Sequence, residues 1–194
     1  MNTMIAESKD LMLIIDMQNV YLPNQPWACL NMTEVTDNIC HLIDHHSADH
    51  FIFTRYLASH HPIGTWREYN ERYQEINDSL WMAQIISPLV PYTTSYPVFN
   101  KSTYSCYGNP DLAGICKTYE RIVITGVVAH CCILSTIFSA IDTGSKVIYL
   151  TDAISGPNLA SIELTKQIVD NFSPLHTITM TTKEYIAEQE TAHR

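Results

Sequence analysis

The sequence predicts an α/β fold: a doubly wound three-layer α/β/α sandwich with a central, mostly parallel six-stranded sheet. Short apolar, β-branched runs recur along the chain, segments of helical period separate them, and the connections are short. Strands that alternate with helices pair in parallel and are covered on both faces, and right-handed crossovers complete the winding. We expect the 194 residues to form one domain, 1–194.

Each expected element has its own pattern. The expected strands are rich in apolar and β-branched residues and cover 11–16, 51–54, 98–99, 122–125, 147–150 and 176–180. The expected helices repeat apolar residues every three or four positions and cover 33–43, 111–119, 131–143, 159–171 and 182–189. Gly144 is suited to end the third of these helices. The aromatic-rich stretch 56–97 predicts short helices and no clear strand.

Composition and charge exclude several classes of function. The chain is 46% apolar and 16% charged, which is typical of a globular protein. Its formal net charge is −9 and it has no basic run, which argues against nucleic acid or an anionic membrane as partners. The run 122–141 is as long as a membrane span, but it changes period halfway and is interpreted as a strand followed by a helix. The polar N-terminus shows no secretory pattern, so we expect a cytoplasmic protein.

Six cysteines lack the paired spacing of a zinc site, and we expect reduced thiols. Those at positions 29, 40, 106 and 116 are interpreted as small core residues. Cys131 and Cys132 differ because they lie where the strand hands over to the helix. A helix N-terminus favours a thiolate through its free N–H groups and its dipole. One of these two cysteines is therefore a candidate nucleophile.

Two other polar residues are expected at the same edge of the sheet. Asp16 closes the first strand and Lys101 follows the third, and ligands of such folds lie beyond the carboxyl ends of the strands. Alone, Asp16 could be a helix cap and Lys101 a solvated surface residue. Together with a cysteine they predict a hydrolase, because the lysine stabilises a thiolate and the carboxylate takes the thiol proton. His130 is the alternative base. The glycine-rich patterns of nucleotide sites are missing, and we expect no cofactor.

Three segments carry a family resemblance. The segment Leu13-Ile-Ile-Asp-Met-Gln-Asn19 resembles the opening motif of the isochorismatase-like cysteine hydrolases. The segment Lys101-Ser-Thr-Tyr-Ser105 resembles their lysine motif. The segment Gly126-Val-Val-Ala-His-Cys-Cys-Ile133 is similar to their nucleophile motif, G-[VI]-x-T-x-x-C-[VI]. The three occur in order over nearly the whole chain.

The resemblance implies a role for each residue. It places the nucleophile at Cys132 rather than Cys131, makes Asp16 the general base, and gives Lys101 the stabilisation of the thiolate and of developing charge. It also implies a cis peptide bond before Val128.

That bond would turn the N–H of Val128, with that of Cys132, towards an oxyanion hole. Ala129 stands where the family usually has Thr. The family also makes a homodimer or homotetramer an expectation.

The implied reaction cleaves a C–N bond of a small amide, carbamoyl or ureido substrate through a thioester. A vinyl-ether hydrolase of the isochorismatase type, a nicotinamidase-like enzyme and a non-catalytic member are the alternatives. The vinyl-ether hydrolase does not need the cysteine, and a non-catalytic member would be free to lose one of the three residues. The presence of Asp16, Lys101 and Cys132 therefore argues against both.

Metal binding is not expected. Metal-dependent nicotinamidases of this superfamily carry an Asp-x-His pattern after the second strand, and Tyr56 stands where that Asp would be. His60 and His61 adjoin each other without the carboxylate. A second set has helical spacing that suits a metal on paper but is interpreted as a solvated helix face: His41, His45, His46 and Asp49.

The substrate pocket is expected to have aromatic walls. The stretch Pro62-Ile-Gly-Thr-Trp-Arg-Glu-Tyr-Asn-Glu-Arg-Tyr73 resembles the G-T-W-x-x-Y motif of a metal-free branch. Tyr21 and Trp66 are the candidate walls against a flat or apolar substrate group. Arg55 and Arg67 are candidates either to bind a substrate carboxylate or to form surface ion pairs.

Overall fold

The computed structural model describes residues 10–192, and its centre is a six-stranded sheet in the order β3-β2-β1-β4-β5-β6. Every neighbouring pair of strands is parallel. The strands are β1 (Asp10–Ile15), β2 (His50–Tyr56), β3 (Val98–Lys101), β4 (Arg121–Val127), β5 (Lys146–Ser155) and β6 (Thr177–Met180). The predicted six-stranded parallel sheet is confirmed.

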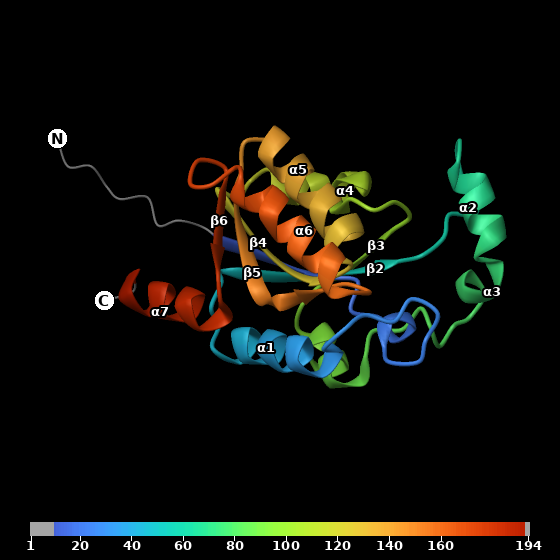
Figure 1. The fold of residues 1–194 in the computed structure, drawn as a ribbon, viewed down its shortest axis with the longest axis horizontal. Helices are drawn as coiled ribbons and strands as arrows, with labels where there is room; N and C mark the ends of the chain where they lie inside the picture. The colour runs from blue at the N-terminus through green and yellow to red at the C-terminus, as the bar shows by residue number, and fades with distance from the viewer. Residues whose placement is uncertain (1–9, 193–194) are drawn as a thin grey trace.

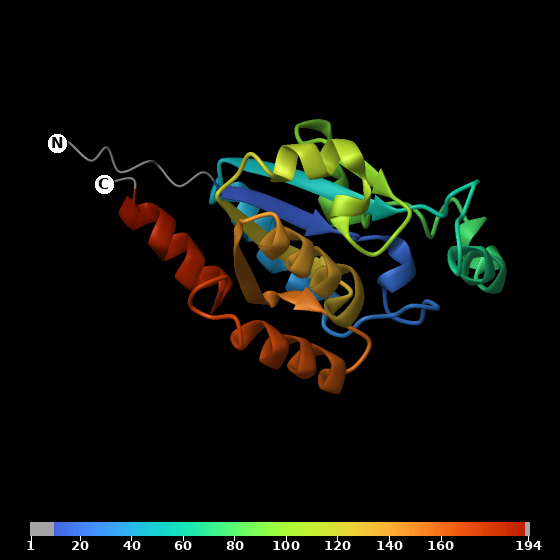
Figure 2. The same cartoon turned by 90° about the horizontal axis from the view of Figure 1, so that it is seen from above.

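Helices cover both faces of this sheet (Figure 1). One face carries α1 (Met32–Asp44), the 3-10 segment η2 (Ser87–Thr94) and α7 (Thr182–Ala192). The other carries α4 (Pro110–Cys116), α5 (Leu134–Asp142) and α6 (Leu159–Asp170). Seen from above, α4 and α6 lie in front of the sheet over its two opposite edges, and α1 lies behind it (Figure 2). The predicted doubly wound sandwich is therefore confirmed. Among the helices of residues 10–192, none is long and apolar enough to cross a membrane.

The central strand β1 shows why the sheet is buried on both faces. All six of its residues are buried. Met12 and Ile14 pack in the core on the α1 side, while Leu11, Leu13 and Ile15 pack on the α4–α5 side. This alternation follows from the two-residue period of a strand. The next residue, Asp16, is the first polar residue after this apolar run, and it lies at the carboxyl edge of the sheet.

Several boundaries differ from the sequence prediction. The helix expected over 111–119 ends at Cys116, and the chain continues in tight turns in which the Tyr119 N–H donates to the Cys116 carbonyl. The strand β3 is longer than expected because its residues pair with β2 as far as Lys101, opposite Tyr56. That pairing fixes Lys101 at the end of a strand rather than on a loop.

The stretch between β2 and β3 is largely irregular, as expected. It contains the short helices α2 (Trp66–Arg72) and α3 (Gln74–Asn77) as well as η2. Figure 1 shows α2 and α3 standing away from the sheet, beyond the end of β2. Neither short helix has a fully buried residue. We call residues 57–78, which include α2 and α3, the arm; it stands at the carboxyl edge of the sheet.

Candidate active site

The strand order reverses between β1 and β4, which places the switch point of the doubly wound fold beyond their carboxyl ends. Asp16 directly follows β1, and Lys101 is the last residue of β3. Cys132 lies in η4 (Ala129–Ile133), the helical turn after β4. The Lys101 Nζ lies 2.6 Å from Asp16 Oδ2 and 3.4 Å from Cys132 Sγ. The structure brings the three sequence-predicted residues into contact.

The Asp16 carboxylate is held on both oxygens. The Thr54 Oγ1 donates to Asp16 Oδ1 at 2.8 Å, and Lys101 contacts Oδ2. The Asp16 backbone adopts a left-handed φ of 53°, and its N–H donates to the Thr54 carbonyl at 3.1 Å. The side chains of Asp16 and Lys101 are 0% exposed. The carboxylate thus has one orientation, which is set by two neighbouring strands.

Gly126 allows the strand that carries the cysteine to approach β1. Its φ is +101°, and a Cβ there would lie 2.1 Å from the Ile15 carbonyl oxygen. The peptide bond between Val127 and Val128 is cis, as the family resemblance implies. In the following turn the Ile133 N–H donates to the Val128 carbonyl, five residues back, at 3.2 Å. This widened π-helical turn carries Cys132 towards Lys101.

Burial governs the charges at the site. Burial raises the pKa of the Cys132 thiol well above its usual value, and Asp16 raises it further, while Lys101 opposes them. Burial disfavours the Lys101 cation, but Asp16 and Cys132 outweigh it and raise the pKa of the amine. In the resting site the ammonium group therefore contacts both a protonated thiol and a carboxylate.

A cavity of about 330 Å³ opens onto Cys132. Its lining residues come from the loop after β1, the arm, the β3–α4 loop, the turn after β4 and the loop after β5: Tyr21, Pro26, Trp27, Ala28, Tyr69, Tyr73, Tyr104, Val128, His130, Cys131, Cys132 and Pro157. Cys132 is 4% exposed, whereas Cys131 is half-buried. Asp16 and Lys101 lie behind the Cys132 thiol rather than on the wall. A molecule in the cavity therefore meets the thiol first.

The structure separates the two predicted wall residues. Tyr21 lines the cavity, but Trp66 does not; its ring packs against Tyr104 and Tyr69, with centroids 5.0 and 5.1 Å apart. Sequence reasoning missed Trp27. Its position shortly after the Asp16 motif, between prolines and Cys29, was a weak signal, because the fold of this loop depends on long-range hydrogen bonds.

The two candidate arginines do not line the cavity. The Arg55 Nε donates to Asn100 Oδ1 at 2.8 Å, and the Arg67 Nε donates to the Pro62 carbonyl at 3.1 Å. His130 lines the cavity and is exposed. No lysine, arginine, aspartate or glutamate is among the residues that line this cavity.

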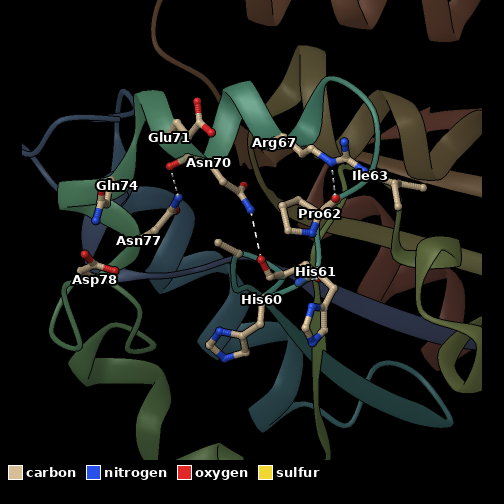
Figure 3. A pocket seen from close by; sticks show the side chains of 12 residues that line it. His60, His61, Pro62, Ile63, Arg67, Asn70, Glu71, Gln74, Asn77 and Asp78 are labelled. Atoms are coloured by element: carbon tan, nitrogen blue, oxygen red, sulfur yellow. Dashed lines mark hydrogen bonds between the residues drawn. The ribbon is translucent and has the colours of Figure 1, made fainter.

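A larger pocket of about 770 Å³ lies at the arm, away from the triad, and is formed by residues between 58 and 78 (Figure 3). His60 and His61 lie here, and Figure 3 shows both imidazoles pointing away from the Glu71 carboxylate. Within residues 10–192, no three His, Cys, Asp or Glu side chains gather as a group that could hold a metal ion. The larger pocket has no cysteine on its wall and lies away from Asp16 and Lys101, so the smaller one is the candidate active site.

Comparisons with known proteins identify the family and the fold. The isochorismatase domain family matches residues 10–183. A comparison with curated proteins gives no significant match.

Three solved structures share the fold. A cysteine hydrolase from Pseudomonas syringae pv. phaseolicola 1448A is 20% identical, with a TM-score of 0.81 over 97% of this chain and 95% of that one. An isochorismatase-like hydrolase from Alkaliphilus metalliredigens is 21% identical, with a TM-score of 0.73 over 93% and 98%. The protein PnC1 from L. infantum, in complex with nicotinate, is 17% identical, with a TM-score of 0.67 over 92% and 95%. The family match over most of the chain shows that this protein belongs to the isochorismatase family and is a hydrolase.

Proposed function

We propose that this protein is a cysteine hydrolase that cleaves the C–N bond of a small amide, carbamoyl or ureido compound through a thioester on Cys132. The observation that carries the proposal is a buried ammonium group that contacts both a carboxylate and a thiol, with the thiol on the wall of a cavity. A thiol with its own base and a fixed cation is what covalent acyl transfer requires.

The first half of the reaction forms the thioester. Cys132 Sγ attacks the substrate carbonyl carbon while its proton passes to Asp16. The resulting oxyanion is stabilised by the backbone N–H groups of Val128 and Cys132. The tetrahedral intermediate then collapses, the C–N bond breaks, and Asp16 gives the proton to the leaving nitrogen.

The second half releases the acid. Asp16 takes a proton from a water molecule that attacks the thioester carbonyl, and the C–S bond breaks. The thiolate sulfur recovers the proton from Asp16, which restores the resting site. Lys101 remains cationic throughout and balances the negative charge that moves between the carboxylate and the sulfur.

The contacts favour Asp16 over His130 as the base. Lys101 contacts both Cys132 Sγ and the Asp16 carboxylate, and Thr54 also holds that carboxylate in place beside the thiol. The exposed His130 side chain has no comparable anchor to fix it against the sulfur.

A nicotinamidase-like activity is the second candidate. The aromatic cavity wall supports it, as does the complex of PnC1 from L. infantum with nicotinate. The vinyl-ether and non-catalytic alternatives gain no support from an intact triad in contact.

Release of ammonia from a panel of small primary amides and ureas, with nicotinamide included, tests the proposal. We expect activity in the wild type and in Cys131→Ala, none in Cys132→Ala, and no effect of a chelator. Cys131 is the matched control because it is the neighbouring thiol on the same cavity wall. Activity that survives in Cys132→Ala would overturn the thioester mechanism. Activity lost to the chelator would favour a metal-dependent nicotinamidase instead.

A further inference from the structure

The cavity above Cys132 is walled by five aromatic side chains: Tyr21, Trp27, Tyr69, Tyr73 and Tyr104. Trp27 joins them, because its ring centroid lies 5.9 Å from that of Tyr21 and 5.5 Å from that of Tyr73. The centroid of the Tyr69 ring lies 4.7 Å from that of Tyr73 and 6.3 Å from that of Tyr104, which connects Tyr104 to the other rings. These rings form one connected aromatic wall.

The rings face the cavity from different directions. The planes of Trp27 and Tyr73 are inclined at 81° and those of Tyr69 and Tyr104 at 89°, whereas those of Tyr21 and Trp27 are inclined at 34°. Rings at such different inclinations around one cavity form the sides of a box, and a box of aromatic faces matches a rounded group such as an alkylated ammonium ion.

The charges around the box favour a cation and disfavour an anion. Burial is the largest cause that raises the pKa of Tyr69 and of Tyr104, so both remain neutral phenols. The nearest fixed cation, Lys101, is behind the thiol and already paired with Asp16. A substrate carboxylate would lose its water here and find no lysine or arginine on the wall, only the exposed His130, whereas a cation gains the negative faces of the rings.

We propose that the box binds the remote end of the substrate and selects a quaternary ammonium group over an uncharged or carboxylate group of the same shape. The proposal rests on the proposed function, because it places the scissile amide at Cys132 and the ammonium group among the rings. The formal charge of −9 on the chain would add long-range attraction for such a cation.

Choline and 3,3-dimethylbutan-1-ol test the box without any turnover, because they have the same shape and differ in charge. We expect choline to bind the wild-type protein about tenfold more tightly by titration calorimetry. The preference should vanish in Trp27→Leu and survive in Trp27→Phe, which keeps an aromatic ring. It should also survive in Trp81→Leu, a matched control whose side chain is 49% exposed and outside this cavity. Equal binding of the two alcohols would overturn the proposal.

Turnover is compared with 4-(trimethylammonio)butanamide, the neutral 5,5-dimethylhexanamide and the carboxylate 4-carboxybutanamide. The charge is far enough from the carbonyl to leave its reactivity nearly unchanged. We expect kcat/KM to be at least about tenfold higher for the cation than for the neutral amide, and lowest for the carboxylate. Cys132-dependent hydrolysis without a charge preference would overturn the box and leave the hydrolase. A choline preference without Cys132-dependent hydrolysis would overturn the hydrolase and leave a cation site.

Discussion

Replacing Lys101 with methionine should be strongly destabilising. Methionine keeps much of the length of the side chain but removes three contacts of the ammonium group: Asp16 Oδ2 at 2.6 Å, the Thr103 carbonyl at 3.1 Å and Cys132 Sγ at 3.4 Å. Because the side chains of Lys101 and Asp16 are 0% exposed, water does not replace the lost cation. In the variant, Thr54 is the one side chain of residues 10–192 that still donates a hydrogen bond to the buried Asp16 carboxylate.

The magnitude follows from that burial. Removing one partner of a buried ion pair costs about 4 kcal/mol, which lowers Tm by about 12 °C for a domain of this size. The raised pKa of Lys101 means that the stabilisation from its ammonium group is fully present at pH 5 and at pH 8 and is lost only above about pH 10.4.

Differential scanning calorimetry and urea unfolding at pH 5 and pH 8 measure the effect. The exposed pair of Lys166 and Asp170, with the same geometry at 2.7 Å, supplies the control: Lys166→Met should cost less than about 1 kcal/mol. The double variant Asp16→Asn/Lys101→Met should recover about 2 kcal/mol of the loss. A deficit below about 1 kcal/mol in Lys101→Met would refute the reasoning.

Three further predictions concern residues around the site and the sheet. Thr54→Val removes the donor to the Asp16 carboxylate and should lower kcat about tenfold with little change in KM, while Thr54→Ser restores it, by steady-state kinetics. Gly126→Ala places a Cβ against the β1 backbone at positive φ and should destabilise by about 3 kcal/mol or more, by urea unfolding. Tyr185→Phe loses a 2.6 Å hydrogen bond to the buried Asp10 and should cost about 2 kcal/mol in the same assay.

Each of these predictions has a contradicting result. Equal kcat in Thr54→Val and wild type would mean that the carboxylate is oriented without the hydroxyl. A Gly126→Ala variant of wild-type stability would show that β1 and β4 can move apart without cost. A neutral Tyr185→Phe would show that the other partners of Asp10, among them Arg121 at 3.0 Å and Gln189 at 3.3 Å, satisfy the carboxylate without the hydroxyl.

The sequence was sufficient for the sheet and the triad because both depend on simple rules. Continuous apolar runs, such as residues 11–15 of β1, predict a buried parallel sheet, and the carboxyl ends of parallel strands lie at one edge of that sheet. Asp16, Lys101 and Cys132 each stand at or just beyond such an end, so their contact could be expected.

The cavity wall and its supports were not accessible in the same way. The loop that carries Trp27 is held by the Leu30 N–H, which donates to the Gly156 carbonyl, and no local pattern shows a contact over that separation. Thr54 looks like an ordinary β-branched residue inside a strand, although its hydroxyl orients Asp16. Trp66 was expected on the wall, but its ring is turned against Tyr104.

The charge of the nucleophile also differs from the helix N-terminus argument. That argument favours a thiolate, yet burial and Asp16 raise the pKa of Cys132 more than Lys101 lowers it. Desolvation penalises a buried anion more than one neighbouring cation offsets. The proposed mechanism therefore needs a carboxylate beside the thiol, to take the proton as the sulfur attacks.

Other expectations stay predictions. The single domain over 1–194 extends beyond the described residues 10–192 and beyond the family match at 10–183. The homo-oligomer, the cytoplasmic location and the metal-free G-T-W-x-x-Y branch likewise stay predictions.

Alkylation by iodoacetamide, followed by peptide mapping over time, tests the central claim most directly. Cys131 is the more exposed of the two adjacent thiols, so exposure alone would favour it. If Asp16 and Lys101 activate Cys132, that thiol should be modified fastest of the six, and Asp16→Asn should slow its modification without affecting Cys131. Uniform labelling, or faster modification of Cys131 with Cys132 indifferent to Asp16→Asn, would contradict the account.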